Sequence, residues 1–282
     1  MTDPARSVAR DPEHALALIA DLERRSEALE VSFEECRIRW RRIGSGPHLV
    51  LLHGGNGNWL HWARNIDALS RQHTLWLPDL PGCCGSQALE SPSLERLVAA
   101  LRQSIDSLIG ADQPMALAAF SFGAVLASNL ALARAGVSRL VLLGATGHGL
   151  PRSQIPLKNW RLVANGAAQD EVHRHNLAQL MLYGDGAVDA LALEIHRAAS
   201  EQARLRSKKL SHTDATRQAL DRLSIPVQLI WGEHDPTAQV VATAQALTQG
   251  QSNRRSAIIA GAGHWVQYQC PDEINRLLCD WF

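Results

Sequence analysis

Ser121, Asp235 and His264 of this 282-residue chain together provide the three residue types that carry out nucleophilic catalysis. A serine hydroxyl becomes an effective nucleophile when a histidine removes its proton, and a carboxylate holds that imidazole in the required tautomer. Each of the three follows a short apolar run, in the stretches LAAFS, IWGEHD and IIAGAGH. They lie far apart in the sequence, so only a fold that gathers the ends of these runs could make them one site.

The elements that would position them follow from the hydrophobic pattern. Six short apolar runs end in Gly, Pro, Asp or His, and most of them are separated by segments of helical periodicity. This alternation predicts buried parallel strands in a doubly wound α/β sheet, which binds ligands beyond the carboxyl ends of its strands, where His53 and Asp79 also lie. The alternating stretch 32–47 predicts an antiparallel hairpin at the start of the sheet. The six predicted strands cover 48–54, 73–82, 114–121, 138–145, 225–235 and 254–264.

One long segment interrupts the alternation. Residues 147–223 contain helical patterns but no convincing buried strand, and an unstructured loop of that length would be unusual. We therefore predict a helical cap at 147–223, inserted into a core made of 31–146 and 224–282. Residues 1–30 are predicted as an N-terminal helical extension.

Composition limits the possible partners. The 28 basic and 28 acidic residues balance, which argues against nucleic acid or an anionic membrane and favours a small-molecule substrate. The chain shows no signal-peptide pattern and no apolar run long enough to span a bilayer, so a cytoplasmic location is expected. Five cysteines, an odd number, suit a reducing compartment. Cys83 and Cys84 are adjacent but lack the spacing of a metal site, so we expect loop thiols and no metal.

The motif AFSFG around Ser121, with the chain order Ser, Asp, His, resembles the α/β-hydrolase family over residues 37–282. The resemblance implies Ser121 as nucleophile, Asp235 as acid and His264 as base, with no cofactor. Ala119 replaces the first glycine of the usual GxSxG, and alanine is small enough for a strained strand-to-helix turn. The stretch DLPGCCGS resembles the structural DxPGxGxS turn of the family, with Cys84 in place of a glycine.

The same resemblance implies an oxyanion hole. In the family, the backbone N–H of the residue after an HG pair supplies one donor, which places Gly55 in the hole. The second donor is the backbone N–H of Phe122, the residue after the nucleophile, at a helix N-terminus where the dipole favours an anion. His53 of that HG pair is a structural residue in the family, and it is the histidine that competes with His264 for the role of base.

Simpler roles exist for single members of the set. Alone, Ser121 would suit a helix N-cap, and an aspartate before Pro236 would suit a turn. The agreement of Ser121, Asp235 and His264 with one family pattern favours the catalytic interpretation.

A serine nucleophile implies acyl transfer to water through an acyl-enzyme, in contrast to family branches with an aspartate nucleophile. Trp265 after His264 is similar to the branch that cleaves carbon–carbon bonds in meta-cleavage products, whereas Phe120 replaces the Asn of that branch. We expect hydrolysis of a small ester or related acyl substrate. The alternatives are a carbon–carbon bond hydrolase of 2-hydroxy-6-oxodienoate type and a catalytically silent, ligand-binding member of the fold.

Three residues are expected to contact substrate: Phe120 as an apolar wall, Trp265, and Arg197 as a clamp for a carboxylate. Arg204 and Arg206 are further candidates for the clamp. The competing interpretation of this basic segment is a solvated helix face, because runs of charge are mostly exposed.

Overall fold

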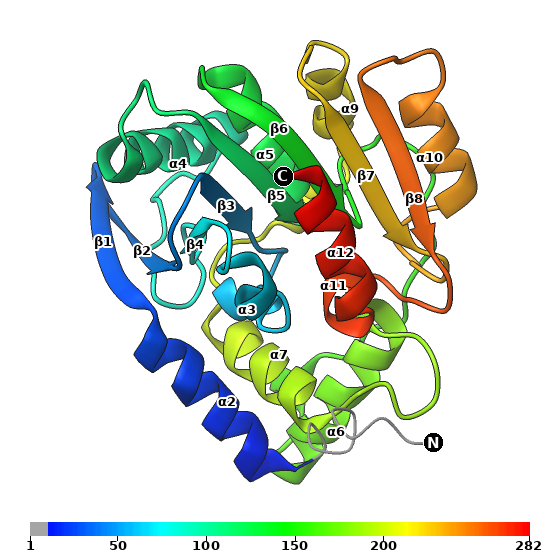
Figure 1. Cartoon of the computed structure of the whole chain (residues 1–282). Coiled ribbons are helices and arrows are strands. Elements are labelled where there is room, and N and C mark those ends of the chain that lie inside the picture. Colours follow the sequence, from blue (N-terminus) through cyan, green and yellow to red (C-terminus); the bar gives the residue numbers. More distant parts are fainter. Residues whose placement is uncertain (1–10) are drawn as a thin grey trace.

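The computed structural model describes residues 11–282 and contains one eight-stranded sheet, shown in Figure 1. The strand order is β1-β2-β4-β3-β5-β6-β7-β8. The strands from β4 to β8 pair in parallel, as predicted, and β1 and β2 form the predicted antiparallel hairpin. The β2–β4 pair is also antiparallel, which was not predicted. The strands are β1 (Glu27–Phe33), β2 (Cys36–Ile43), β3 (His48–Leu52), β4 (Thr74–Pro78), β5 (Met115–Phe120), β6 (Val137–Leu143), β7 (Val227–Gly232) and β8 (Arg254–Ile259).

Helices cover both faces of the sheet. One apolar cluster joins the sheet to α4, α5 and α10, and a second joins the opposite face to η1, α3 and α12. The helices are α2 (Pro12–Arg25), η1 (Trp59–Trp62), α3 (Ile66–Leu69), α4 (Leu94–Ile109), α5 (Phe122–Ala133), η2 (Trp160–Leu162), α6 (Ala167–Asn176), η3 (Leu177–Met181), α7 (Ala190–Gln202), α8 (Lys208–Ser211), α9 (Ala215–Leu220), α10 (Val240–Thr248), α11 (Val266–Gln269) and α12 (Pro271–Trp281).

Burial on both faces explains the continuous apolar runs of the central strands. In β5, Ala119 joins the cluster with α4 and α5, whereas Ala118 and Phe120 join the cluster on the other face. Side chains of a strand alternate between the two faces, so a strand covered on both sides has no polar face. The loop after β5 therefore follows a strand whose position is fixed by packing on both faces of the sheet.

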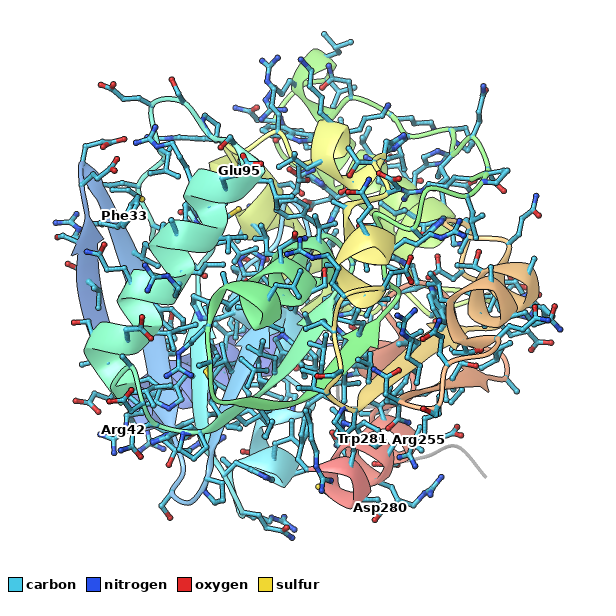
Figure 2. All side chains as sticks on the ribbon, turned by 90° about the horizontal axis from the view of Figure 1, so that it is seen from above. Phe33, Arg42, Glu95, Arg255, Asp280 and Trp281 are labelled. Carbon is cyan, nitrogen blue, oxygen red and sulfur yellow. The ribbon has the colours of Figure 1, made fainter. Side chains whose placement is uncertain are left out.

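Two boundaries differ from the predictions. The hairpin begins at Glu27, five residues before the predicted start, so the end of the predicted extension 1–30 is a strand; residues 1–10 of that extension lie outside the described residues. Strand β8 is not buried along its length, because it is an edge strand and Arg255 and Ser256 are exposed. Figure 2 shows Arg255 beside Trp281 of α12, with the guanidinium 4.1 Å from the ring centroid.

Between β6 and β7 the chain forms helices and no strand; we call residues 147–223 the helical insertion. Its last two helices, α8 and α9, pack against α5 of the sheet layer. Its helices α6 and α7 pack together, and α7 also contacts α2. Within residues 11–282, no helix has both the length and the apolar character needed to cross a membrane.

Candidate active site

Ser121 occupies a sharp turn between β5 and α5. Its φ of 53° and ψ of −117° place a non-glycine residue in an unfavourable backbone region, as expected for a strained strand-to-helix corner. Its N–H donates to the carbonyl of Leu143 at 2.8 Å, which ties the turn to β6. Although Ser121 is the N-cap residue of α5, its side chain makes no capping hydrogen bond, so its hydroxyl is available for another partner.

Small residues make this turn possible. A Cβ added to Gly123 would lie 2.6 Å from the carbonyl oxygen of His53, so only glycine allows α5 to pass so close to the end of β3. A Cβ on Gly54 would meet the ring of Phe120 at 3.0 Å. Ala119, at the first position of the motif, is fully buried in β5 and accommodates the turn without a glycine.

His264 reaches Ser121 from the loop after β8. Its Nε2 lies 2.8 Å from the Ser121 hydroxyl oxygen, and its ring is almost fully buried. Gly144, after β6, leaves the space for this ring, because a Cβ there would lie 2.9 Å from two ring atoms. The strand ends of β5, β6 and β8 thus set the position of one imidazole.

Asp235 completes the chain of hydrogen bonds from the loop after β7. Its Oδ2 lies 2.7 Å from Nδ1 of His264, and its Oδ1 accepts from the N–H and hydroxyl of Thr237 at 2.8 and 2.7 Å. One carboxylate oxygen of Asp235 therefore stabilises the turn at Thr237, and the other contacts the imidazole of His264. Sequence reasoning missed Thr237; its position two residues after an aspartate in a turn is the signal that could have identified it.

The electrostatics of this pair favour an ionised carboxylate. Burial raises the pKa of Asp235, but the charge and hydrogen bond of His264 and the two bonds from Thr237 lower it further, so that it lies below the ordinary value. Asp235 is thus a carboxylate that keeps its charge despite complete burial of its side chain.

Gly55 and Phe122 lie side by side at the Ser121 turn. A Cβ built on Gly55 would lie 3.7 Å from that of Phe122, and within residues 11–282 neither N–H donates to an acceptor. Phe122 is the first residue of α5, where N–H groups have no partner inside the helix. Ser207 of the helical insertion covers this point, with its hydroxyl 2.3 Å from the same built Cβ.

Two buried histidines brace the loop that contains Gly55. His53 accepts from the Leu80 N–H at Nε2, and its Nδ1 lies 2.7 Å from the Gly54 carbonyl, so both its nitrogens are engaged by backbone. His61, which sequence reasoning missed, accepts from the Gly54 N–H at Nδ1. Burial lowers the pKa of His53 to about 4, so it is neutral at pH 7. The structure therefore brings His264, and not His53, to Ser121.

The two aromatic residues predicted to contact substrate are both almost fully buried. The ring centroid of Phe120 lies 4.9 Å from that of His264, so it packs beside the imidazole. Trp265 has no exposed surface; it stacks on Tyr268 and donates its indole N–H to the carbonyl of His61. Trp265 thus supports the loop of His61 from within the core instead of lining an open pocket.

The side chain of Arg197 is paired elsewhere and forms no contact with Ser121, Asp235 or His264. Its guanidinium bonds both oxygens of Glu194 at 2.7 and 2.9 Å, one turn earlier on α7, and its side chain is 37% exposed. Arg204 and Arg206 are exposed, as the solvated-face interpretation expects. Arg152 interacts electrostatically with Asp235. Burial lowers the pKa of Arg152, and the charge of Asp235 partly offsets this effect. The sequence pattern around Arg152 gave no sign of this interaction.

The adjacent cysteines are not arranged as a metal site. Cys83 and Cys84 form no disulfide, and residues 11–282 contain no group of three or more potential ligands placed to hold a metal ion. Cys84 has a φ of 40°, which explains why the family motif has glycine at this position. Burial raises the pKa of its thiol to about 12, which makes it a poor nucleophile.

The family model described as the alpha/beta hydrolase family matches residues 49–277. This range covers most of the chain and includes Ser121, Asp235 and His264.

Individual relatives fall into several activities. A 2-hydroxy-6-oxononadienedioate/2-hydroxy-6-oxononatrienedioate hydrolase of Dechloromonas aromatica is 26% identical over 265 residues, covering 87% of this chain and 90% of the relative. A dihydrolipoyllysine-residue acetyltransferase component of the acetoin cleaving system of Pseudomonas putida is 27% identical over 85% of this chain, which spans only 65% of that longer protein. The carboxylesterase CesB of Bacillus subtilis shares the fold, with a TM-score of 0.74 at 20% identity, covering 95% of this chain and 98% of the esterase.

Proposed function

The chain belongs to the α/β-hydrolase family, and we propose that it is a serine hydrolase that cleaves a small ester or related acyl substrate through an acyl-enzyme. The observation that carries this proposal is the continuous hydrogen-bonded chain from Ser121 through His264 to Asp235, with distances of 2.8 and 2.7 Å. Its hydrolase relatives support the reaction class.

In the proposed reaction, Nε2 of His264 accepts the Ser121 proton as the hydroxyl oxygen attacks the acyl carbon. The ionised Asp235 stabilises the imidazolium and holds Nδ1–H toward itself. The N–H groups of Gly55 and Phe122 donate to the oxyanion, each contributing about 2.7 to 4 kcal/mol in enzymes where such donors were removed. His264 then protonates the leaving group, and a water molecule, activated by the same imidazole, hydrolyses the acyl-enzyme.

A fluorophosphonate probe tests this proposal. We expect the probe to label Ser121, and Ser121→Ala to abolish both labelling and most of the turnover of aryl esters while the far-UV circular dichroism spectrum stays unchanged. Ser128→Ala is a matched control, because Ser128 lies in α5 with its hydroxyl bonded to a helix carbonyl. Undiminished labelling of the Ser121→Ala protein would refute the assignment, and a failure of the wild type to react would favour a silent, ligand-binding member of the family.

A second candidate is a carbon–carbon bond hydrolase. The relative from Dechloromonas aromatica, matched over nearly its whole length, favours it, as does Trp265 directly after His264. Against it stands the apolar Phe120, packed beside His264, where that branch places a polar side chain. Cleavage of a dienoate requires protonation on carbon, and this needs groups that recognise the dienol and its carboxylate.

The two candidates are separated by comparing kcat/KM for p-nitrophenyl butyrate and a phenyl-substituted 2-hydroxy-6-oxodienoate. We expect the ester to be the better substrate, because the wall beside Ser121 is apolar. A dienoate preference of about a hundredfold, equivalent to about 2.7 kcal/mol of transition-state binding, would establish the second candidate.

A further inference from the structure

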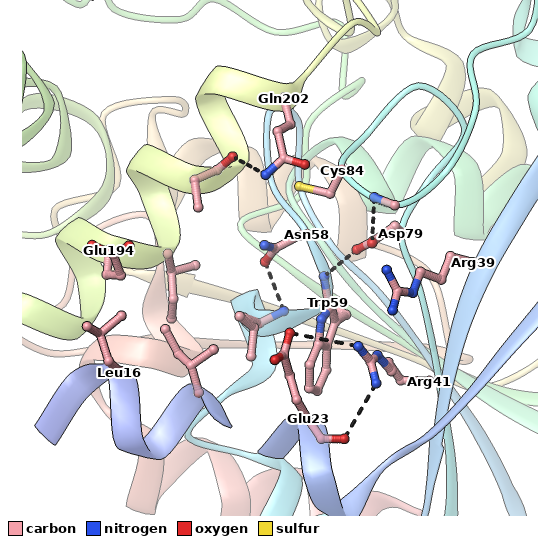
Figure 3. Close-up of a pocket in the computed structure, with 15 residues that line it drawn as sticks. Leu16, Glu23, Arg39, Arg41, Asn58, Trp59, Asp79, Cys84, Glu194 and Gln202 are labelled. Carbon is pink, nitrogen blue, oxygen red and sulfur yellow. Dashed lines mark hydrogen bonds and ion pairs between the residues drawn. The ribbon is translucent and has the colours of Figure 1, made fainter. Parts of the chain in front are cut away.

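A cavity lies between α2, α7 and the first strands of the sheet, and none of Ser121, Asp235 and His264 lines it. Its volume is about 300 Å³, within the range of sites for small molecules. Figure 3 shows that its walls come from elements far apart in the sequence: α2 and α7 on one side, and β2 with the loops after β3 and β4 on the other.

Two arginines of β2 form the cationic wall. Arg39 and Arg41 are two residues apart on the strand, so both side chains lie on the same face. Arg41 is nine-tenths buried, yet its nearest acceptors, the Glu23 carbonyl and the Ser26 hydroxyl, are 3.5 Å away. The guanidinium of Arg39 forms no hydrogen bond or ion pair with any residue of 11–282. Because a guanidinium has five N–H donors, this wall has unused donor capacity.

The acidic side chains of the cavity leave that capacity unfilled. Both oxygens of Asp79 already accept backbone N–H groups, from Trp59 at 3.2 Å and from Gly85 at 3.0 Å. Glu194 is held by Arg197 on its own helix. The Glu23 side chain is about half exposed, and its carboxylate stays 3.8 Å from Arg41. Glu23 therefore forms one long ion pair with Arg41, and Asp79, whose pKa burial raises and the charges of both arginines partly lower again, forms no hydrogen bond with either of them.

Gly85 makes room for Arg39. A Cβ on Gly85 would lie 2.5 Å from Cδ of Arg39, in the middle of that side chain and not at its flexible end. The absence of a side chain at position 85 lets Arg39 lie along the loop backbone and present its guanidinium to the cavity, as Figure 3 shows.

The opposite wall is mainly aliphatic, although Glu194 and Gln202 of α7 also line it. Aliphatic side chains from α2 and α7 face each other across the cavity, on the side away from the two arginines in Figure 3. The cavity thus has two arginines on one side and a mainly aliphatic wall on the other, and its lining also includes the acidic residues Glu23, Asp79 and Glu194. The aliphatic residues are Leu16, Ile19, Leu60, Ile195 and Ala198.

We propose that this cavity binds a small carboxylate with an apolar body, such as a medium-chain monocarboxylate. The carboxylate lies between Arg39 and Arg41, where a guanidinium pairs with both of its oxygens. The hydrocarbon body lies between α2 and α7. The site is separate from the triad, and its occupation does not depend on catalysis at Ser121.

Isothermal titration calorimetry with octanoate tests the site, using the Ser121→Ala protein to exclude turnover. We expect saturable binding that Arg39→Gln weakens by about tenfold or more, as for loss of a charge-assisted hydrogen bond. Arg42→Gln is the matched control: Arg42 is the exposed neighbour on the same strand, bonded to Glu27, and its loss should change the affinity by less than about twofold. Equal affinity of the Arg39→Gln and Arg42→Gln proteins overturns the proposal.

A second variant tests the apolar wall without touching a charge. Ala198→Leu fills the aliphatic side of the cavity, so it should weaken octanoate binding by about tenfold while acetate, which lacks the chain, is affected by less than about twofold. Octanol, which lacks the charge, should bind more weakly than octanoate. No saturable binding of octanoate to the folded protein, or competition by inorganic phosphate as effective as by octanoate, overturns the proposal.

Discussion

The Asp235–His264 pair and the helical insertion differ in how completely the polar atoms of their side chains are hydrogen-bonded. Asp235 and His264 are buried, and every oxygen and nitrogen of the pair has a partner at hydrogen-bonding distance. In the helical insertion, His173 is fully buried with neither ring nitrogen hydrogen-bonded within the described residues, and Leu162 is 81% exposed. The packed loops at the strand ends can hold the Asp235 and His264 side chains in one geometry. The insertion, by contrast, contains the unpaired ring nitrogens of His173, which could still bind a partner.

This contrast predicts that substitutions at the strand ends are the most damaging to turnover. Asp235→Asn leaves a side chain of the same shape but removes the charge that orients and stabilises the imidazole, so kcat should fall by about 10⁴. His264→Ala should cause a loss of at least the same order. Steady-state rates with an aryl ester measure the effect. If His53→Gln were more damaging than His264→Ala in a folded protein, the base would be His53.

The burial of His53, in the loop after β3, should make the stability of the protein depend on pH. The pKa of His53 falls from 6.5 in the unfolded chain to about 4 in the fold, so its contribution is fully present above pH 6.5 and is lost as the pH falls toward 4. The difference corresponds to about 3 kcal/mol. Asp79, whose pKa burial raises to about 6, contributes with the opposite sign, since it favours the folded state at low pH.

Urea denaturation of wild type and His53→Gln at pH 7 and pH 4.5 isolates this effect. Asp79 titrates in both proteins, so it largely cancels in the comparison. We expect the wild type to lose more stability than the variant between the two pH values. An equal loss would show that His53 does not titrate in this window.

A smaller effect is expected one step from the reacting atoms. Thr237→Val removes the hydroxyl that donates to Asp235 and leaves the backbone N–H bond in place, so kcat should fall by about tenfold. Thr237→Ser keeps the hydroxyl and should restore most of the rate. A loss of rate in both variants, with KM unchanged, would mean that the methyl group and not the hydroxyl matters.

The smallest effect is expected on the exposed face of the insertion. Arg197 pairs with Glu194 on the same helix, so Arg197→Gln should change kcat/KM by less than about twofold and unfolding free energy by less than about 0.5 kcal/mol. A selective loss of activity toward substrates that carry a carboxylate would instead place Arg197 at the substrate and narrow the contrast between the two regions.

Short apolar runs in the sequence predicted the parallel sheet and the order of its elements along the chain, and Ser121, Asp235 and His264 could be named as one candidate site before the structure was known. These features are local: a buried strand is a short apolar run, and the triad residues follow such runs at strand ends, which a parallel sheet brings to one edge. The alternating N-terminal stretch likewise indicated an antiparallel hairpin, though it did not show that the pairing extends back to Glu27.

The partners of the remaining side chains could not be predicted, because they depend on how distant segments pack together. Trp265 and Arg197 have the residue types of substrate contacts, yet the first is buried against Tyr268 and the second is paired within α7. Thr237 reaches the site through its contact with His264, which is distant in the sequence. Arg39 lines a cavity that exists because α2 and α7 pack together near β2. A side chain's partner depends on long-range packing, which the periodicity of one segment does not encode.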